Sequence, residues 1–120
     1  MGVIVVIEDD PDVQRLLAAL LEEAGHQVET ARDGVEGVQV VERVRPDLVL
    51  VDVGLPGSVD GLEVTRRLRA GDCADVPVLA LTAHGDPRVR EAGEAAGVTD
   101  YLVKPEGIVG LVARVAELIA

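Results

Sequence analysis

Aromatic side chains are nearly absent from this sequence, which contains one tyrosine and neither phenylalanine nor tryptophan. A hydrophobic core must therefore be built from valine, leucine, isoleucine and alanine. Hydrophobic residues nevertheless make up 48% of the 120 positions, which is enough for one sizeable core. This length, without any linker, repeat or low-complexity stretch, predicts a single domain over residues 1–120.

Basic residues are also scarce: 11 lysines and arginines stand against 22 aspartates and glutamates, a formal net charge of −11. This balance argues against direct nucleic-acid binding, which requires a basic face, and against docking on an anionic membrane. The single cysteine, Cys73, excludes an internal disulfide and fits the reducing cytoplasm. The apolar start has no basic segment before it and predicts no signal peptide, and no run is long enough to cross a membrane.

What the chain does contain is a fivefold alternation of short aliphatic runs and segments of helical periodicity. The runs, which we predict to be strands, are Val3–Ile7, Gln27–Ala31, Asp47–Val51, Val76–Leu81 and Thr99–Val103. The helices are predicted to begin at Pro11, Asp33, Asp60, Asp86-Pro87 and Ile108. Inward-facing positions are predicted at Val35, Val38 and Val41 of the second helix and at Ile108, Leu111, Val112, Val115 and Ile119 of the last.

Strands that are separated by helices must run parallel, with right-handed crossovers that cover both faces of the sheet. Continuous apolar runs such as VIVVI and LVLV agree, because parallel strands are buried on both sides. We therefore predict an α/β fold, a flavodoxin-like (βα)5 doubly wound parallel sheet with strand order 2-1-3-4-5. A Rossmann-like order is less favoured, because no G-x-G-x-x-G follows the first strand.

Polar residues follow four of the predicted strands. Glu8 and Asp9 follow the first, Asp52 the third, Thr82 the fourth and Lys104 the fifth. In the predicted order these strands are neighbours about 4.8 Å apart, so their end residues converge on one edge of the sheet. An all-oxygen cluster suits a hard divalent cation such as Mg²⁺, and a lysine beside it suits an anion. The pattern predicts a site for a phosphoryl group and Mg²⁺ at a carboxylate.

Taken singly, each of these residues has a plainer interpretation. Asp52 is an ordinary strand-end residue, and the acids after the first strand suit a helix N-terminus. Thr82 alone fits a buried strand, Lys104 alone a surface lysine, and Tyr101 alone partly buried filler. Only their combination, in this order on adjacent strand ends, favours a functional site.

The motifs VIEDDPDV, PDLVLVDVGLPG, ALTAHG and DYLVKP together resemble a response-regulator receiver domain of two-component signalling, and the resemblance covers essentially the whole chain. It implies that Asp52 is the phosphoacceptor. It also implies a Mg²⁺ (or Mn²⁺) site in which Asp9 binds the ion directly, Glu8 acts through water and the Gly54 carbonyl is a ligand. Asp10 falls where family members vary and is left out of this set.

The same resemblance assigns the remaining positions. Thr82 is similar to the family's switch hydroxyl, Lys104 to the lysine that pairs with Asp52 or its phosphoryl group, and Tyr101 to the aromatic switch residue. The pair Lys104-Pro105 implies a cis peptide bond. Three departures lie outside these positions: the loop PGSVDG is one residue longer than usual, Glu106 replaces a usual phenylalanine, and the last helix lacks an acid at its start.

Three small or polar residues are expected to tune the site. Ala83 and Gly54 leave room for a donor histidine, while His84 and Gly54 occupy the two positions at which family members set the lifetime of the phosphoryl group. Gly54 has no side chain to block water, so we expect moderately fast autodephosphorylation. His84 on its own is more often an ordinary loop histidine than a catalytic one.

The resemblance implies a cytoplasmic signalling switch rather than an enzyme. A phosphohistidine on a histidine kinase or histidine phosphotransfer protein would donate its phosphoryl group to Asp52. The face formed by the fourth helix, the fifth strand and the fifth helix would then change, and this same face could also serve for dimerisation.

Two other classes of function stay open at this point, together with a variant of the receiver domain itself. A hydrolase with an aspartyl-phosphate intermediate usually carries its nucleophile after the first strand in a D-x-D arrangement, whereas Asp52 stands alone after the third. A flavin-binding flavodoxin-like protein usually has aromatic residues to stack on the flavin, and this chain has almost none. A receiver that works without phosphorylation is opposed by the intact set of Glu8, Asp9, Asp52, Thr82 and Lys104.

Overall fold

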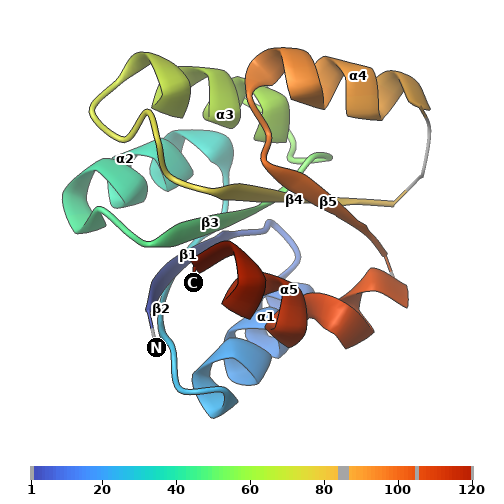
Figure 1. Cartoon of the computed structure of the whole chain (residues 1–120). Coiled ribbons are helices and arrows are strands. Elements are labelled where there is room, and N and C mark those ends of the chain that lie inside the picture. The colour runs from blue at the N-terminus through green and yellow to red at the C-terminus, as the bar shows by residue number, and fades with distance from the viewer. Residues whose placement is uncertain (1, 84–86, 105, 120) are drawn as a thin grey trace.

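The structure, a computed structural model, describes residues 2–83, 87–104 and 106–119 and shows the predicted alternation of strands and helices (Figure 1). Its elements are β1 (Val3–Ile7), α1 (Pro11–Glu23), β2 (Gln27–Ala31), α2 (Gly34–Val44), β3 (Leu48–Asp52), α3 (Gly61–Ala70), β4 (Val78–Thr82), α4 (Pro87–Ala96), β5 (Asp100–Val103), the 3₁₀ helix η1 (Glu106–Gly110) and α5 (Leu111–Ile119).

The five strands form one sheet in which every neighbouring pair is parallel, in the order β2-β1-β3-β4-β5. Helices α1 and α5 cover one face, and α2, α3 and α4 cover the other (Figure 1). Alternate strand residues therefore enter different cores: Ile4 and Val6 pack with α1 and α5, while Val5 and Ile7 pack with α2 and α3. The predicted doubly wound fold and strand order are confirmed.

Three strands and the last helix differ from the prediction, and β5 differs only in beginning at Asp100 rather than Thr99. β4 begins at Val78 rather than Val76, because the Val76 N–H donates to Cys73 in a turn and Pro77 has no N–H for the ladder. β3 extends to Asp52, which pairs with Leu81 of β4. The segment predicted as the start of the last helix forms η1 instead, and α5 begins only at Leu111.

The inner face of α2 is lined partly by glycines, which corrects the prediction that Val35 faces inward. Val35 is 51% exposed, whereas Gly34, Gly37, Val40 and Val41 are buried. A Cβ on Gly37 would lie 2.5 Å from Ile7 of β1, so the helix packs this closely only because the side chain is missing. The prediction fails only at Val35, because Val41 is buried and Val38 packs against the same core.

The inward prediction for α5 was also wrong at one position. Val112 is 37% exposed, while Leu111 and Val115 are fully buried against the sheet. Ile108 and Ile119 are partly buried and pack against the same core. The helix therefore presents a narrower apolar stripe to the sheet than the prediction assigned to it.

Aspartates cap the three helices that follow β1, β2 and β3. Asp10, Asp33 and Asp60 each accept a hydrogen bond from a backbone N–H in the first turn of α1, α2 and α3. The caps of α1 and α2 lie within three residues of the carboxyl ends of β1 and β2, whereas a longer loop separates β3 from the cap of α3. The connections after β1 and β2 are therefore short and well anchored, which positions the residues that follow these strands.

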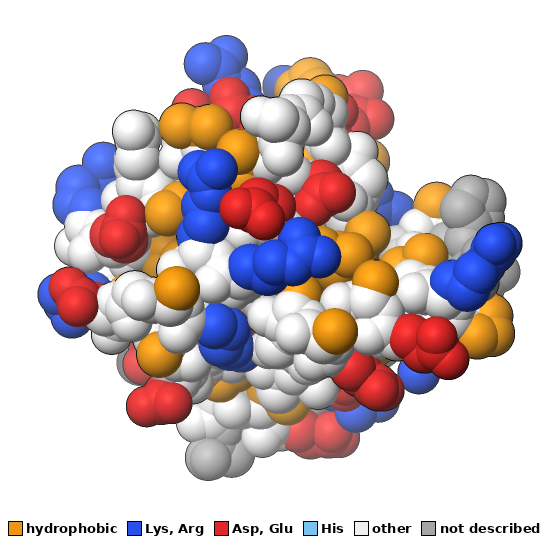
Figure 2. Space-filling view, turned by 90° about the horizontal axis from the view of Figure 1, so that it is seen from above, with side chains coloured by type: hydrophobic (Ala, Val, Ile, Leu, Met, Phe, Trp, Pro, Cys, Tyr) orange, Lys and Arg blue, Asp and Glu red, His pale blue; other side chains and the backbone are white. Residues whose placement is uncertain are grey.

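Acidic and basic side chains are interspersed on the face seen from above in Figure 2, over the helices that cover the upper side of the sheet. Along α3, Glu63 pairs with Arg66 at 3.3 Å and with Arg67 at 3.1 Å. These basic side chains are therefore matched by an acid of the same helix.

Candidate functional site

Asp52 lies at the carboxyl end of a deeply buried strand, β3. Leu48, Val49, Leu50 and Val51 have no exposed surface, and the Asp52 side chain that follows them is 13% exposed. The chain turns away at once, and the Gly54 N–H donates a 2.8 Å hydrogen bond to Asp52 Oδ1. The buried strand thus delivers one carboxylate to the edge of the sheet, where its backbone neighbour orients it.

Two further acids reach this carboxylate from the end of β1. Glu8 is 2% exposed and Asp9 is exposed, and one oxygen from each lies within 4.8 Å of an Asp52 oxygen and of the other. Within residues 2–83, 87–104 and 106–119, nothing donates a hydrogen bond to the buried Oε2 of Glu8. Three close carboxylates with an unsatisfied buried oxygen fit a hard divalent cation.

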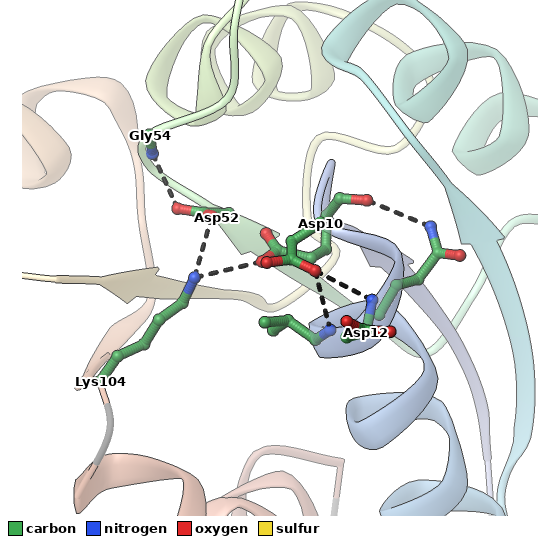
Figure 3. Close-up of polar contacts among 8 residues, drawn as sticks. Asp10, Asp12, Asp52, Gly54 and Lys104 are labelled. Carbon is green, nitrogen blue, oxygen red and sulfur yellow. Dashed lines mark hydrogen bonds and ion pairs between the residues drawn. The ribbon is translucent and has the colours of Figure 1, made fainter.

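Lys104, at the end of β5, points into the same group of acids (Figure 3). Its ammonium nitrogen lies 2.9 Å from Asp52 Oδ2 and 3.3 Å from Glu8 Oε1. Its backbone N–H donates to the carbonyl oxygen of Thr82 at 2.8 Å, which carries the pairing of β4 and β5 one step past the strand ends. The lysine is thus positioned to neutralise charge at Asp52.

These contacts shift the pKa values of the three groups in different directions. Burial, followed by the nearby Asp52, raises the pKa of Glu8 to about 8, although Lys104 opposes the shift. Burial alone would raise the pKa of Asp52, but its interactions with Glu8, Gly54 and Lys104 outweigh burial and lower it. Burial opposes the charge on Lys104, but the two acids raise its pKa. Asp52 is therefore the carboxylate that keeps its charge here.

Thr82 is the last residue of β4, next to the strand that carries Asp52, and is 6% exposed. The sequence-based expectation that strand ends bring Glu8, Asp9, Asp52, Thr82 and Lys104 to one edge agrees with this arrangement. Their functional roles are a separate matter and stay predictions.

Tyr101 lies further inside the sheet, on β5, and packs against α4. It is 8% exposed, its hydroxyl donates to the Arg90 carbonyl at 2.8 Å, and the Arg90 guanidinium lies 5.3 Å from the ring centre. A Cβ on Gly93 would overlap the Tyr101 hydroxyl oxygen, so a gap in the helix surface admits the ring. The aromatic residue is therefore linked to α4 by three separate contacts.

The other predicted site residues divide into described and undescribed ones. Ala83 follows β4 and is exposed. His84 and Pro105 lie outside the described residues, so the tuning role of His84 and the cis peptide stay predictions. One site contact was missed from the sequence: the hydrogen bond from the Gly54 N–H to Asp52 (Figure 3). Asp10 caps α1, in agreement with the plainer interpretation of the acids after the first strand as a helix N-terminus.

No helix within the part of the chain that the structure describes combines the length and the apolar character needed to span a membrane.

Comparison with known proteins agrees with this geometry. Residues 4–116 match the family model described as the response regulator receiver domain. The chain is 44% identical over 117 residues to the response regulator MprA of Mycobacterium leprae, and 41% identical over 117 residues to RpaA of Synechocystis, described as a DNA-binding dual master transcriptional regulator. These alignments cover 97% of this chain but 50% and 48% of the relatives, so the chain spans about half their length.

A solved structure is similar over nearly the full length of both chains. It is the receiver domain of sensor histidine kinase PA1611 from Pseudomonas aeruginosa, with a magnesium ion coordinated in its active-site cleft. The TM-score is 0.89 at 36% sequence identity, over 98% of this chain and 97% of that one. Fold, strand-end residues and sequence similarity agree, and the chain belongs to the response regulator receiver domain family of two-component signalling systems.

Proposed function

We propose that Asp52 accepts a phosphoryl group from a phosphohistidine on a partner protein. The phosphorus–nitrogen bond of the donor breaks, and a bond forms between phosphorus and an Asp52 carboxylate oxygen. The electron pair of the broken bond stays with the imidazole, whose other nitrogen carries the proton that leaves the ring neutral. The product is an acyl phosphate. The observation that supports this most strongly is the ion pair of 2.9 Å between Lys104 and an Asp52 whose pKa is lowered.

A divalent cation fits the acids around Asp52. Asp9, Asp52 and the Gly54 carbonyl would hold Mg²⁺ or Mn²⁺, with Glu8 acting through water, and the unpartnered Oε2 of Glu8 supports such an ion. When bound, the ion supplies positive charge that offsets the charge of the phosphoryl oxygens.

The chain's own residues orient Asp52 and neutralise charge during the transfer. The lowered pKa of Asp52 keeps its carboxylate ionised and nucleophilic, and the Gly54 N–H orients one of its oxygens. Lys104 offsets the charge of a phosphoryl oxygen, and the small side chain of Ala83 leaves space for the donor imidazole. Phosphoryl transfer depends mostly on such positioning and charge neutralisation.

The phosphorylated state would act by shifting a conformational equilibrium. The phosphoryl group attracts the Thr82 hydroxyl, Tyr101 moves toward the space that Thr82 vacates, and the face of α4, β5 and α5 changes for a partner or a second copy. The tyrosine's contacts with Arg90 and Gly93 support a link between β5 and α4. The domain would then be a signalling switch rather than an enzyme.

The donor would be a histidine kinase or a histidine phosphotransfer protein, and the domain would work in the cytoplasm. The family supports this choice of donor. Because the chain spans about half of its curated relatives, their output activities are not carried over to it.

The test is incubation with a small acyl phosphate and Mg²⁺, followed by intact-mass measurement. We expect the wild type to gain one phosphoryl group, and Asp52→Asn to gain none. The gain should disappear when the metal is chelated. Equal labelling of Asp52→Asn, or a wild type that stays unlabelled, would contradict the proposal.

A further inference from the structure

The short segment that carries Glu8 and Asp9 is held from both sides by hydrogen bonds. The side-chain amide of Gln14, in the second turn of α1, donates to the carbonyl oxygen of Glu8 at 3.1 Å and to that of Ala31 at 3.0 Å. The Ala31 carbonyl also accepts the Glu8 N–H at 3.0 Å. These three bonds form a closed ring that contains both backbone polar groups of Glu8.

The next residues of this segment are held by the start of α1. Asp10 Oδ1 accepts the N–H of Asp12 at 2.9 Å, and the Asp10 carbonyl accepts the backbone N–H of Gln14, also at 2.9 Å. Asp9 therefore lies between two anchored residues. The peptide group that joins Glu8 to Asp9 is held directly, because its carbonyl is the one that Gln14 binds.

Such anchoring matters at this place because a cation needs the three acids to lie close together. Oxygens of Glu8, Asp9 and Asp52 lie within 4.8 Å of each other, and Glu8 is 2% exposed. Without the anchoring bonds, the segment would be free to open whenever no cation is bound. The cost of closing it again would then reduce the affinity for the cation, whereas a segment that is already ordered avoids this cost.

We infer that Gln14 is a positioning residue for the acidic pair, holding Glu8 and Asp9 in the arrangement that binds a divalent cation before the cation arrives. Gln14 does not touch the cation. It acts through the backbone of Glu8 and through the end of β2, so it joins the site to a strand that carries none of the site's acids. This inference rests on the proposed function, because it assigns a role toward the metal that phosphoryl transfer requires.

The test compares Gln14→Met with Gln39→Met. Methionine has a similar length and helix propensity but no N–H to donate, and Gln39 is an exposed residue of α2. For each folded protein, the Mg²⁺ dissociation constant is measured by calorimetry at one pH and ionic strength, and the free energy of unfolding is measured without metal. We expect the dissociation constant to rise about tenfold in Gln14→Met and to stay unchanged in Gln39→Met.

A merely structural glutamine gives a different result: metal-free stability falls in Gln14→Met while the dissociation constant of the folded protein stays at the wild-type value. That outcome would overturn the inference and leave the proposed function intact. A wild type that does not bind Mg²⁺ would contradict both.

A measurement on the wild type covers the case in which Gln14→Met does not fold. Backbone ¹⁵N relaxation in the metal-free protein should show Glu8 and Asp9 as rigid as the residues of β1. Mobility of these two residues that disappears only on addition of Mg²⁺ would overturn the inference.

Discussion

The third strand carries an aspartate next to each of its ends, and the two differ in almost everything except residue type. Asp47, just before β3, is exposed, and its Oδ2 accepts the Val3 N–H at 2.8 Å. Asp52, the last residue of β3, is 13% exposed and pairs with Lys104. Asp47 links the start of β1 to the start of β3 by a hydrogen bond, whereas Asp52 places its charge beside the partly buried charges of Lys104 and Glu8.

The difference shows that position in the sheet, rather than residue type, selects the functional carboxylate. At the Asp47 edge, Arg45 and Asp72 form an ion pair of 3.6 Å between side chains that are 64% and 82% exposed. At the Asp52 edge, Lys104 meets two acids and is 22% exposed, and pKa values shift. Water screens the exposed charges of Arg45 and Asp72. The partly buried charges around Asp52 are screened less, so they interact more strongly with an added anion or cation.

Replacement of one basic side chain at each edge of the sheet should give the largest difference in the rate of phosphorylation. Lys104→Met should slow phosphoryl uptake from a small acyl phosphate about a hundredfold, because the charge of the incoming oxygens loses its fixed partner. Arg45→Met should leave the rate unchanged and alter the free energy of unfolding by less than about 1 kcal/mol. Initial rates from intact-mass time courses test both. Comparable rate losses in the two variants would show that the edges are not functionally distinct.

The pH dependence of stability should give the next largest effect. The pKa of Glu8 is about 8 in the folded protein and 4.5 in the unfolded chain, so the folded state binds the extra proton. The stability from this proton is fully present below about pH 4.5 and is lost as the pH rises through about 8. We expect the metal-free protein to lose about 2 to 4 kcal/mol of unfolding free energy between about pH 5 and pH 9.

Glu8→Gln should remove most of this loss, and Asp47→Asn should retain it. Urea denaturation with a chelator present, at several pH values, measures the difference. The lowered pKa of Asp52 acts at acidic pH, where stability is lost as its carboxylate is protonated, so the two effects are separable. An unchanged slope in Glu8→Gln would contradict the burial of its charge at this edge.

The smallest effect concerns the packing of Tyr101 against α4, which links β5 to this helix. Gly93→Ala places a methyl group where the Tyr101 hydroxyl lies, so the ring must move. Overpacking should cost about 1 to 3 kcal/mol, offset by about 1 kcal/mol from better helix propensity. Gly110→Ala is the control, because a Cβ there meets nothing within 4 Å.

Tyr101 is the only aromatic residue in the chain, so tyrosine fluorescence reports its surroundings without interference. We expect Gly93→Ala to change this fluorescence toward that of the phosphorylated wild type, and Gly110→Ala to leave it unchanged. A wild-type spectrum in Gly93→Ala would show that the contact with α4 does not hold the ring.

Much of this architecture was predictable because parallel α/β proteins follow strong local rules. The strand spans Val3–Ile7 and Gln27–Ala31 were predicted to the residue, and the strand order followed from the alternation of elements. The convergence of Asp52 and Lys104 then required only their positions at the carboxyl ends of β3 and β5, which lie on either side of β4. These are consequences of chain geometry rather than of side-chain detail.

The errors arose where packing outweighs sequence pattern. Val35 fitted a helical stripe of valines, but the face of α2 that meets the sheet is marked by Gly34 and Gly37, which a search for apolar residues ignores. Gln14 gave no signal either, because an amide that binds two carbonyls differs from a surface glutamine only once β2 lies beside α1. Hydrogen bonds between distant segments are visible only in three dimensions.

Mapping of the phosphorylated residue tests the central claim most directly. The protein is incubated with a small acyl phosphate and Mg²⁺ and treated with borohydride, which reduces an aspartyl phosphate to homoserine, and its peptides are sequenced by mass spectrometry. We predict homoserine at position 52 and unmodified aspartate at positions 9, 10 and 47. Homoserine at any of these other positions in place of 52, or no homoserine in a protein that has gained a phosphoryl group, would contradict the assignment of Asp52 as the phosphoacceptor.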